Sequence, residues 1–319
     1  MTNPASEEAL GVKRLTYAKY LLRSANVSLR SPSSLVAAQG LLRLHDSIEI
    51  FQSVALDKIG VPKQKYGAFM EFWERVKEKT NVEPPYKDRF RALNDLRSSF
   101  KHQALLPNAE EVRELASVVP LFFDEVCRNL FAFHFAEISL GNLMPEGEVR
   151  NRVKTAERLA EAKDFCGAAG ELAIVMELLF GTMFPDIPCD DPWSSLFMSG
   201  HVSYKGILGR SGELGVGAVW ALDDCLDEIQ SQIEELRHVV SLVAWGVDLR
   251  DYVRFRTTTP NARRSPSGDY ECFWRHEIRP TYDDIGFCLQ FVIDTALNVE
   301  ARRHDAPPGA RALKARNNG

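Results

Sequence analysis

The sequence lacks the features of exported and membrane-spanning chains. Residues 1–8 contain no basic segment followed by an apolar run, so we expect no secretory signal. The most apolar stretch, residues 172–184, is shorter than the roughly 18 residues that a membrane helix needs, and it contains Glu177. These absences predict a cytoplasmic protein with no membrane partner.

Patterns typical of metal, disulfide and phosphate-loop sites are absent as well. The six cysteines are scattered, with no Cys-x-x-Cys pair and no histidine at metal-ligand spacing. We therefore interpret them as reduced, mostly buried thiols and expect no metal and no cofactor. Glycines at 206, 209, 212 and 215 follow no predicted strand and precede no Gly-Lys-Ser/Thr, so they predict a flexible connection.

The charge balance excludes a broad basic surface that would coat nucleic acid. The net charge is −5 at pH 7, although a small basic cleft remains compatible with it. Apolar residues make up 45% of the chain and charged residues 26%, which is typical of a folded globular protein. The length of 319 residues allows two domains of ordinary size.

Helical periodicity dominates, and strand-like alternation is nowhere convincing, so the sequence predicts an all-α fold. Asn108, with Glu111 three residues on, predicts a helix cap. The Ser31–Ser34 cluster predicts a break and another cap. The predicted helices cover residues 17–25, 34–59, 69–79, 88–104, 108–137, 150–183 (a hairpin turning near Cys166 and Gly167), 220–255 (broken near Gly246) and 281–303, with loops at 185–217 and 261–268.

Two segments of the chain align without a gap, residues 96–108 with residues 249–261. Both begin with Leu-Arg, carry an apolar residue four positions after the leucine and a basic residue next, and end with Pro-Asn. This agreement predicts an internal duplication; the alternative is that amphipathic helices resemble one another in general. In the second segment His102 is replaced by Phe255, whereas the arginine is retained as Arg250.

Two arginine/histidine pairs lie only a few residues apart in the sequence. Arg97 and His102 lie near the end of a predicted helix, whereas Arg128 and His134 lie among bulky apolar residues. We interpret His134 as a core or interface histidine. On an ideal helix, positions i and i+5 point about 140° apart. Arg97 and His102 therefore meet at one site only if the helix ends or distorts there, or if the site is shared across an interface.

The segment Leu-Arg-Ser-Ser-Phe-Lys-His, residues 96–102, resembles the Arg-x4–6-His signature of the HEPN superfamily. Many HEPN proteins are RNA-cleaving toxins or antiviral defence effectors. Asn is common after the arginine in that family, and Ser98 stands there in this chain. The resemblance implies two tandem HEPN-like helical bundles, an active one in residues 1–145 and a degenerate copy in 146–305. We expect residues 306–319 to form a disordered tail.

The resemblance also implies a chemistry and a set of partners. HEPN nucleases cleave RNA without a metal, by attack of the 2′-hydroxyl. His102 would transfer protons, and Arg97 would stabilise the phosphate. The residues expected to bind substrate are Ser98, Lys101 and Arg250. The expected partners are RNA, a neutralising or triggering protein, and either a second copy in a homodimer or the second bundle in an intramolecular pseudo-dimer.

Two alternatives to a nuclease remain. The first is a non-catalytic scaffold or sensor, in which His102 is buried away from any cleft and Arg97 and Lys101 form ordinary surface ion pairs. The candidate partners for those pairs are Asp95, Glu49 and Asp46. The second is a HEPN-like protein that binds RNA or nucleotide without cutting. His45, Asp46 and Glu49 share one helix face, which we interpret as solvated, or else as a polar partner to the site.

Overall fold

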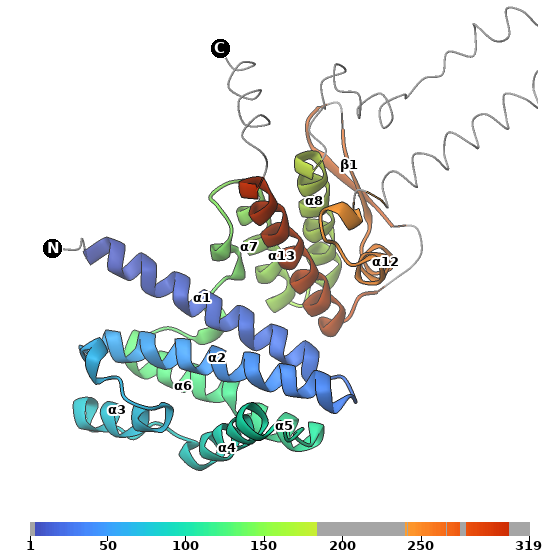
Figure 1. Ribbon diagram of the computed structural model, residues 1–319. Coiled ribbons are helices and arrows are strands. Elements are labelled where there is room, and N and C mark those ends of the chain that lie inside the picture. The colour runs from blue at the N-terminus through green and yellow to red at the C-terminus, as the bar shows by residue number, and fades with distance from the viewer. Residues whose placement is uncertain (1–3, 184–239, 241, 266, 275–278, 306–319) are drawn as a thin grey trace, which may run out of the picture. The chain divides into compact units, whose positions relative to one another are not determined.

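The computed structural model describes residues 4–183, 240, 242–265, 267–274 and 279–305. The chain divides into two compact units, Met1–Lys154 and Thr155–Gly319, and each is described by itself (Figure 1). The predicted loop at 185–217, the glycine run within it, the first part of the predicted helix at 220–255 and the predicted tail at 306–319 lie outside the described residues.

The described residues are mostly helical, as predicted, with one small sheet in the second unit. The helices of the first unit are α1 (Pro4–Leu29), α2 (Ser34–Lys58), α3 (Phe72–Thr80), α4 (Lys87–Gln103), α5 (Ala109–Ala116) and α6 (Val119–Phe131). Short 3-10 turns are η1 (Lys63–Lys65), η2 (Phe69–Glu71), η3 (Phe135–Glu137) and η4 (Leu140–Leu143), and α7 (Glu148–Glu161) crosses the boundary between the units. No helix in the described ranges is long and apolar enough to cross a membrane.

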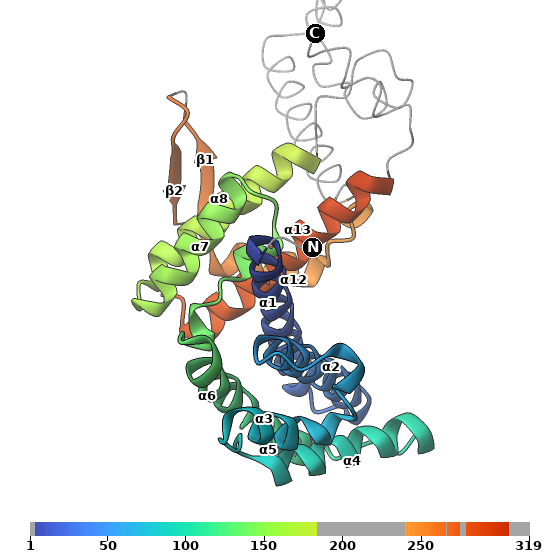
Figure 2. The same cartoon turned by 90° about the vertical axis from the view of Figure 1, so that its left-hand side faces the viewer.

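α2 is the central helix of the first unit. It runs beside α1 over most of its length, and it also contacts α3, α4, α5 and α6 (Figures 1 and 2). Apolar residues at helical spacing, among them Leu41, Leu44, Ile48 and Phe51, are fully buried along it. Because α2 is covered by several helices, even polar residues between those apolar ones are removed from water, and Ser47 is an example.

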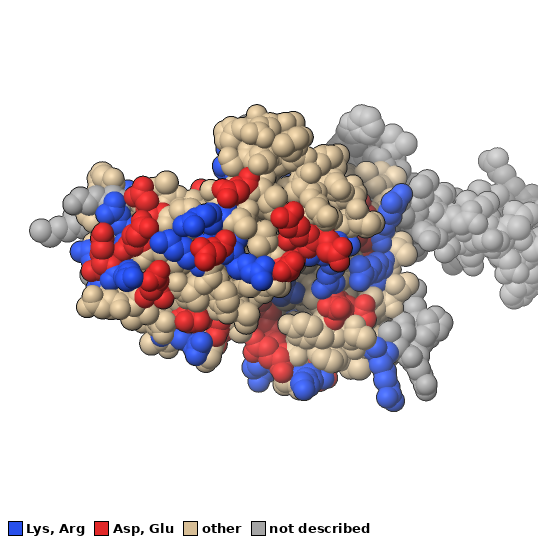
Figure 3. Space-filling view, turned by 90° about the horizontal axis from the view of Figure 1, so that it is seen from below, with Lys and Arg blue, Asp and Glu red and all other residues tan. Residues whose placement is uncertain are grey.

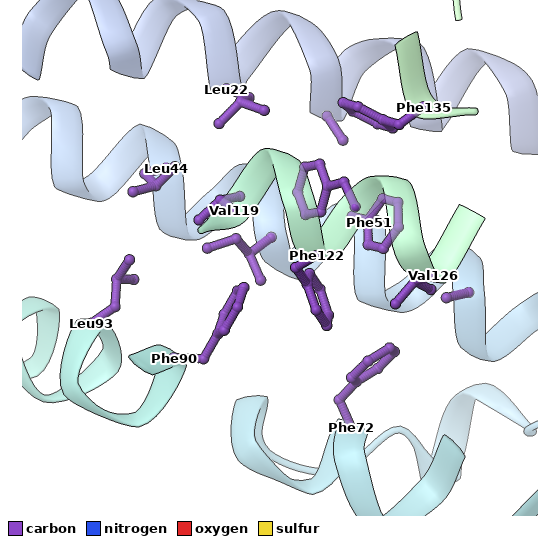
Figure 4. Close-up of a cluster of buried hydrophobic side chains, with 14 of the residues drawn as sticks. Leu22, Leu44, Phe51, Phe72, Phe90, Leu93, Val119, Phe122, Val126 and Phe135 are labelled. Atoms are coloured by element: carbon purple, nitrogen blue, oxygen red, sulfur yellow. The ribbon is translucent and has the colours of Figure 1, made fainter. Parts of the chain in front are cut away.

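An aromatic cluster fills the core of the first unit (Figure 4). Phe122 of α6 lies at its centre, with ring centroids 4.5 Å from Phe90 of α4, 5.9 Å from Phe51 of α2 and 5.9 Å from Phe72 of α3. Each fully buried phenylalanine contributes about 1.5–3 kcal/mol relative to an exposed one. Phe90 therefore anchors the N-terminal half of α4 in the core.

The region 108–137, predicted as one helix, is two helices and a 3-10 turn. α5 ends at Ala116 and α6 begins at Val119, with Pro120 in its first turn. Proline lacks the N–H that a helix interior requires, but the first turn leaves that N–H unpaired anyway. The predicted cap at Asn108 is confirmed, because its side chain accepts a hydrogen bond from the Glu110 amide. The cap predicted within Ser31–Ser34 is not formed: Ser33 precedes α2 without a side-chain hydrogen bond to it.

The second unit contains α8 (Phe165–Met183), α12 (Leu249–Thr258), α13 (Tyr282–Asp305) and an antiparallel hairpin of β1 (Asn261–Arg264) and β2 (Tyr270–Phe273). α8 packs against α13 and the hairpin, and α12 packs against α13. The break predicted near Gly246 is confirmed by its φ of +74°. The turn between α7 and α8 comes earlier than predicted, at Lys163, whose φ is +63°, and Gly167 lies inside α8.

The hairpin corrects the prediction of a loop at 261–268 and of a chain without strands. Each strand has only four residues, and both are largely exposed, so neither shows the apolar alternation by which strands are recognised. Ala262 is the buried position of β1, and it packs against Ala173 and Ile174 of α8. The hairpin thus packs on a helix that is distant in sequence, and the sequences of the two strands do not predict them.

The two aligned segments occupy different structural contexts. Residues 96–103 form the end of a long helix, and Asn108 then caps α5; residues 249–258 are the whole of α12, and Asn261 then begins a strand. Phe255 is 1% exposed and packs in a tilted arrangement on Phe291, with ring centroids 5.1 Å apart, whereas Val253, the shared apolar position, is 60% exposed. The tandem duplication therefore stays a prediction.

Candidate active site

α4 directs Arg97 toward the interior of the first unit. Phe90 and Leu93 are the buried residues of this helix, and Arg97 continues the same face one turn later. Its side chain is half-buried, and its Nε is buried with no hydrogen-bond partner within the described residues. A buried donor without a partner carries a desolvation cost, so the guanidinium has unused capacity to bind an acceptor.

His102 and Lys101 have the opposite environment, because both are exposed in the last turn of α4. Within the described parts of the chain, neither side chain has a hydrogen bond or ion pair. The helix ends at Gln103, and Ala104 follows in the left-handed region with its amide bonded to the Phe100 carbonyl. Because α4 is continuous up to Gln103, Arg97 and His102 point about 140° apart, as an undistorted helix requires.

The surface ion pairs that a purely structural role would give Arg97 and Lys101 do not form among the described residues. Neither pairs with Asp95, Glu49 or Asp46. Other arginines of α4 are paired: Arg89 contacts Glu114 at 2.9 Å, and Arg91 contacts Asp88 at 3.6 Å. Ser98 is half-buried on the same helix. Arg97 and Lys101 are therefore basic side chains of α4 without an internal counter-ion.

The histidine that the structure associates with Arg97 is His45, from α2. Its side chain is 1% exposed, and its ring stacks on Phe69 with centroids 4.3 Å apart. Its Nε2 lies 3.1 Å from Asn94 Oδ1 of α4, and its Nδ1 lies 3.5 Å from Glu49 Oε2. The interpretation of His45, Asp46 and Glu49 as one solvated face is therefore wrong for His45, because α4 covers that side of α2.

Burial is the largest influence on the pKa of His45, and it lowers that pKa below the ordinary histidine value, because the imidazolium form loses its hydration. The positive charge of Arg97 acts in the same direction. The hydrogen bond with Asn94 and the charges of Glu49 and Asp46 oppose the shift. The charge of the candidate arginine thus acts on His45 across the contact between α2 and α4.

Sequence reasoning missed the role of Asn94 and the burial of His45, although one signal was present. His45 lies four residues after Leu41 and three before Ile48, so it occupies the apolar stripe of its helix. A titratable residue on such a stripe is either paired inside the core or exposed through a gap in it. That its partner is Asn94 on α4 can be determined only from the tertiary structure.

The second Arg/His pair is not a core feature. The His134 side chain is 58% exposed, and its Nδ1 lies 3.2 Å from Asp124 Oδ1. Arg128 lies 3.2 Å from the other oxygen of the same carboxylate. Of the two interpretations, a core histidine is wrong, because His134 lies after the end of α6 and pairs with Asp124 at the surface; an interface histidine stays a prediction.

Arg250, the third predicted phosphate contact, is exposed in the first turn of α12 in the second unit. Asp248 caps this helix by accepting hydrogen bonds from the amides of Arg250 and Asp251, at 2.8 and 3.1 Å. Phe255, which stands where the first segment has His102, belongs to the core instead. The second unit therefore presents the arginine without an equivalent histidine.

Charges of both signs lie together on one face of the molecule (Figure 3). On the face shown in Figure 3, Lys and Arg are interspersed with Asp and Glu, in keeping with the acidic net charge. The cysteines divide evenly among those described: Cys127 and Cys288 are buried, and Cys166 and Cys272 are exposed. Burial raises the pKa of both buried thiols to about 12, which makes them poor nucleophiles.

Comparison with known proteins returned no relative. No family model matches the chain, and no curated protein and no solved structure matches it.

Proposed function

We propose that the first unit is a HEPN-like module that cleaves RNA, with Arg97 binding the scissile phosphate and His102 transferring protons. One observation carries the proposal: α4 has an exposed imidazole at His102 and, five residues earlier, an arginine whose buried Nε has no internal partner among the described residues. A residue retained for stability alone would be expected to use its donors within the fold. The exposure of His102 is also the opposite of what the scaffold alternative predicts.

The reaction proposed is an intramolecular transesterification of the RNA backbone. An imidazole accepts the proton of the ribose 2′-hydroxyl as the 2′-oxygen forms a bond to phosphorus. The bond from phosphorus to the 5′-oxygen breaks, and that oxygen receives a proton from an imidazolium. The products are a cyclic 2′,3′-phosphate and a 5′-hydroxyl. The guanidinium of Arg97 stabilises the charge that gathers on the phosphate oxygens, and Ser98 and Lys101 bind neighbouring phosphates.

Because the Arg97 and His102 side chains point in different directions, the proposal has a further requirement. Side chains about 140° apart on one helix face different directions, so a single α4 does not place both against one phosphate. We therefore propose that the site is composite, with Arg97 from one chain and His102 from a second copy. In the alternative arrangement, the second bundle of the same chain completes the site and supplies Arg250.

The biological role proposed is that of a toxin or antiviral defence effector in the cytoplasm. A nuclease that attacks cellular RNA would need restraint, so a neutralising protein or an infection trigger belongs to the same proposal. The second candidate function is RNA binding without cleavage. The observation that favours it is that the Arg97 and His102 side chains point in different directions on an undistorted helix.

The test is cleavage of labelled RNA in EDTA by the full chain and its Arg97→Ala and His102→Ala variants, matched for folding by circular dichroism. Loss of proton transfer or of a phosphate contact is expected to lower the rate by at least about 100-fold. Arg91→Ala, on the same helix, and His134→Ala are the matched controls and should retain activity. RNA binding that survives in a chain without any cleavage would support the second candidate.

Mixing the two inactive variants tests the composite site. In a mixed dimer of Arg97→Ala and His102→Ala chains, one site has both residues intact and the other has neither. Activity should therefore return on mixing if two copies build the site. An active wild type whose two variants do not complement each other would exclude the homodimer arrangement. If the wild type is inert in vitro, growth arrest on expression, with and without infection, is the next comparison between wild type and His102→Ala.

A further inference from the structure

Three side chains of α2 form a compact group of possible metal ligands. His45, Asp46 and Glu49 each offer a ligand atom, and these atoms all lie within 4.8 Å of one another. His45 and Glu49 are four residues apart, a spacing that places two side chains one above the other on a helix. His45 is buried, whereas Asp46 and Glu49 are exposed, so the group lies at the edge of the core with a side open to solvent.

The hydrogen bond with Asn94 determines which ring nitrogen of His45 is available. With the Asn94 amide placed so that its Oδ1 faces the ring at 3.1 Å, Oδ1 accepts, and this contact assigns the proton of His45 to Nε2. In the neutral ring, Nδ1 then carries a lone pair. This atom is buried and has no hydrogen-bond partner among the described residues.

The lone pair of His45 Nδ1 faces another acceptor. Glu49 Oε2 lies 3.5 Å from Nδ1, and an ionised carboxylate has no proton to donate. Two acceptors that face each other at the edge of a core are unfavourable unless a positively charged or hydrogen-bond-donating group lies between them. The position is suited to a cation bound by both atoms.

The distance agrees with shared coordination. Zinc binds histidine nitrogen at about 2.0–2.1 Å and carboxylate oxygen at about 2.0–2.2 Å, which puts two ligands at a tetrahedral angle roughly 3.4 Å apart. The observed separation of Nδ1 and Oε2 is 3.5 Å. Asn94 supplies the second feature of such sites, an acceptor that holds the ring through the nitrogen that does not bind the metal.

We propose that His45 Nδ1, Glu49 and Asp46 bind a first-row divalent cation, with Zn²⁺ as the preferred ion and water completing its coordination. This site goes beyond the proposed RNA cleavage, which needs no metal, and it does not depend on that cleavage. The positive charge of Arg97 acts on His45 and opposes a bound cation, so it lowers the affinity. Arg97→Met should accordingly bind Zn²⁺ more tightly than the wild type.

The experiment is calorimetric titration of the full, EDTA-treated and dialysed chain with Zn²⁺, without RNA. Glu49→Gln and Asp46→Asn change exposed residues and leave the buried ring in place. Each should weaken binding at least tenfold, and Asn94→Ala about 10–100-fold. The matched controls are Glu78→Gln on α3 and Asp88→Asn on α4, which make the same charge changes elsewhere in the first unit and should bind like the wild type.

Co²⁺ in place of Zn²⁺ identifies the ligand type. Co²⁺ bound by nitrogen and oxygen ligands absorbs only in the visible range, whereas thiolate ligands add strong charge-transfer absorption bands in the near ultraviolet. Because Glu49→Gln retains all six cysteines, undiminished binding by this variant would assign the ion to another site and overturn the proposal. A wild type that binds no Zn²⁺ would overturn it as well. Neither outcome affects the EDTA-resistant cleavage expected of the proposed nuclease.

Discussion

Replacing Arg97 by methionine is expected to abolish RNA cleavage while leaving the first unit as stable as the wild type or more stable. Methionine retains the length and apolar character of the arginine stem but removes the guanidinium. If Arg97 stabilises the fold, Arg97→Met lowers the free energy of unfolding; if Arg97 serves function alone, the substitution leaves it unchanged or raises it. The measurement therefore separates the two interpretations of the residue even if the purified protein does not cleave RNA.

The magnitude follows from the environment of the guanidinium. A buried donor without a partner costs about 1–3 kcal/mol, and Arg97 Nε is such a donor among the described residues. The side chain as a whole is only half-buried, so the lower end of that range, about 1 kcal/mol, is the stabilisation expected on its removal. In a domain of this size, 1 kcal/mol corresponds to roughly 2–4 °C in melting temperature.

Hydrogen exchange followed by mass spectrometry is the suitable assay, because peptides from α2 and α4 report on the first unit alone. Tryptophan fluorescence would combine five tryptophans spread over the chain. Arg91→Met is the matched control on the same helix, where the arginine is exposed and pairs with Asp88. It should change the free energy of unfolding by at most about 0.5 kcal/mol.

A loss of more than about 1 kcal/mol in the Arg97→Met variant would refute this reasoning. It would mean that the guanidinium makes net favourable interactions within the fold, and the nuclease proposal would lose the observation that carries it. Stability equal to or above the wild type, together with loss of cleavage, is the expected pair of results.

Three further substitutions test other parts of the structure. Ala104→Gly should stabilise the first unit by about 0.5–1 kcal/mol in urea unfolding, because Ala104 ends α4 with a φ of +56°, a conformation that favours glycine; a destabilised variant would contradict this. Phe122→Ala should cost about 3–5 kcal/mol, since its fully buried ring lies between α2, α3 and α4, and a cost below about 1 kcal/mol would argue against this core. In the second unit, burial raises the pKa of Glu177, with Arg256 opposing. The stability that Glu177 contributes is then complete below its unfolded-state pKa and is lost as the pH rises through its folded-state pKa. Glu177→Gln should remove that decline and be more stable than the wild type at pH 7, as measured by denaturant unfolding at pH 4.5 and 7; identical pH profiles would contradict the shift.

The helices that border the candidate site were predicted almost to the residue. The prediction of 34–59 corresponds to α2 at Ser34–Lys58, and that of 88–104 to α4 at Lys87–Gln103. Both are long amphipathic segments between breaks rich in proline, serine or glycine, and such signals are local. The 108–137 region was predicted as one helix, because its apolar periodicity continues across the break between Ala116 and Val119.

The positions of the candidate residues could be predicted only in part. That His102 comes at the end of a helix follows from the sequence, because Pro107 limits how far the helix extends. His45 was interpreted as solvated but is buried, and the core alternative for His134 is contradicted by its exposed side chain. The place of His45 on the apolar stripe of its helix is a local signal, but which helix or loop covers each histidine depends on parts of the chain distant in sequence.

The sequence alone determined that this chain is mostly helical, that α4 carries the Arg97 and His102 motif at its end, and that no broad basic surface is to be expected. Only the tertiary structure decided that α4 packs on α2, that Asn94 orients His45, and that Arg97 lies on the inward side of its helix without an internal partner. The physical reason is one of range. Helical periodicity arises from hydrogen bonds four residues apart, whereas His45 and Asn94 are 49 residues apart and meet only because their helices pack together.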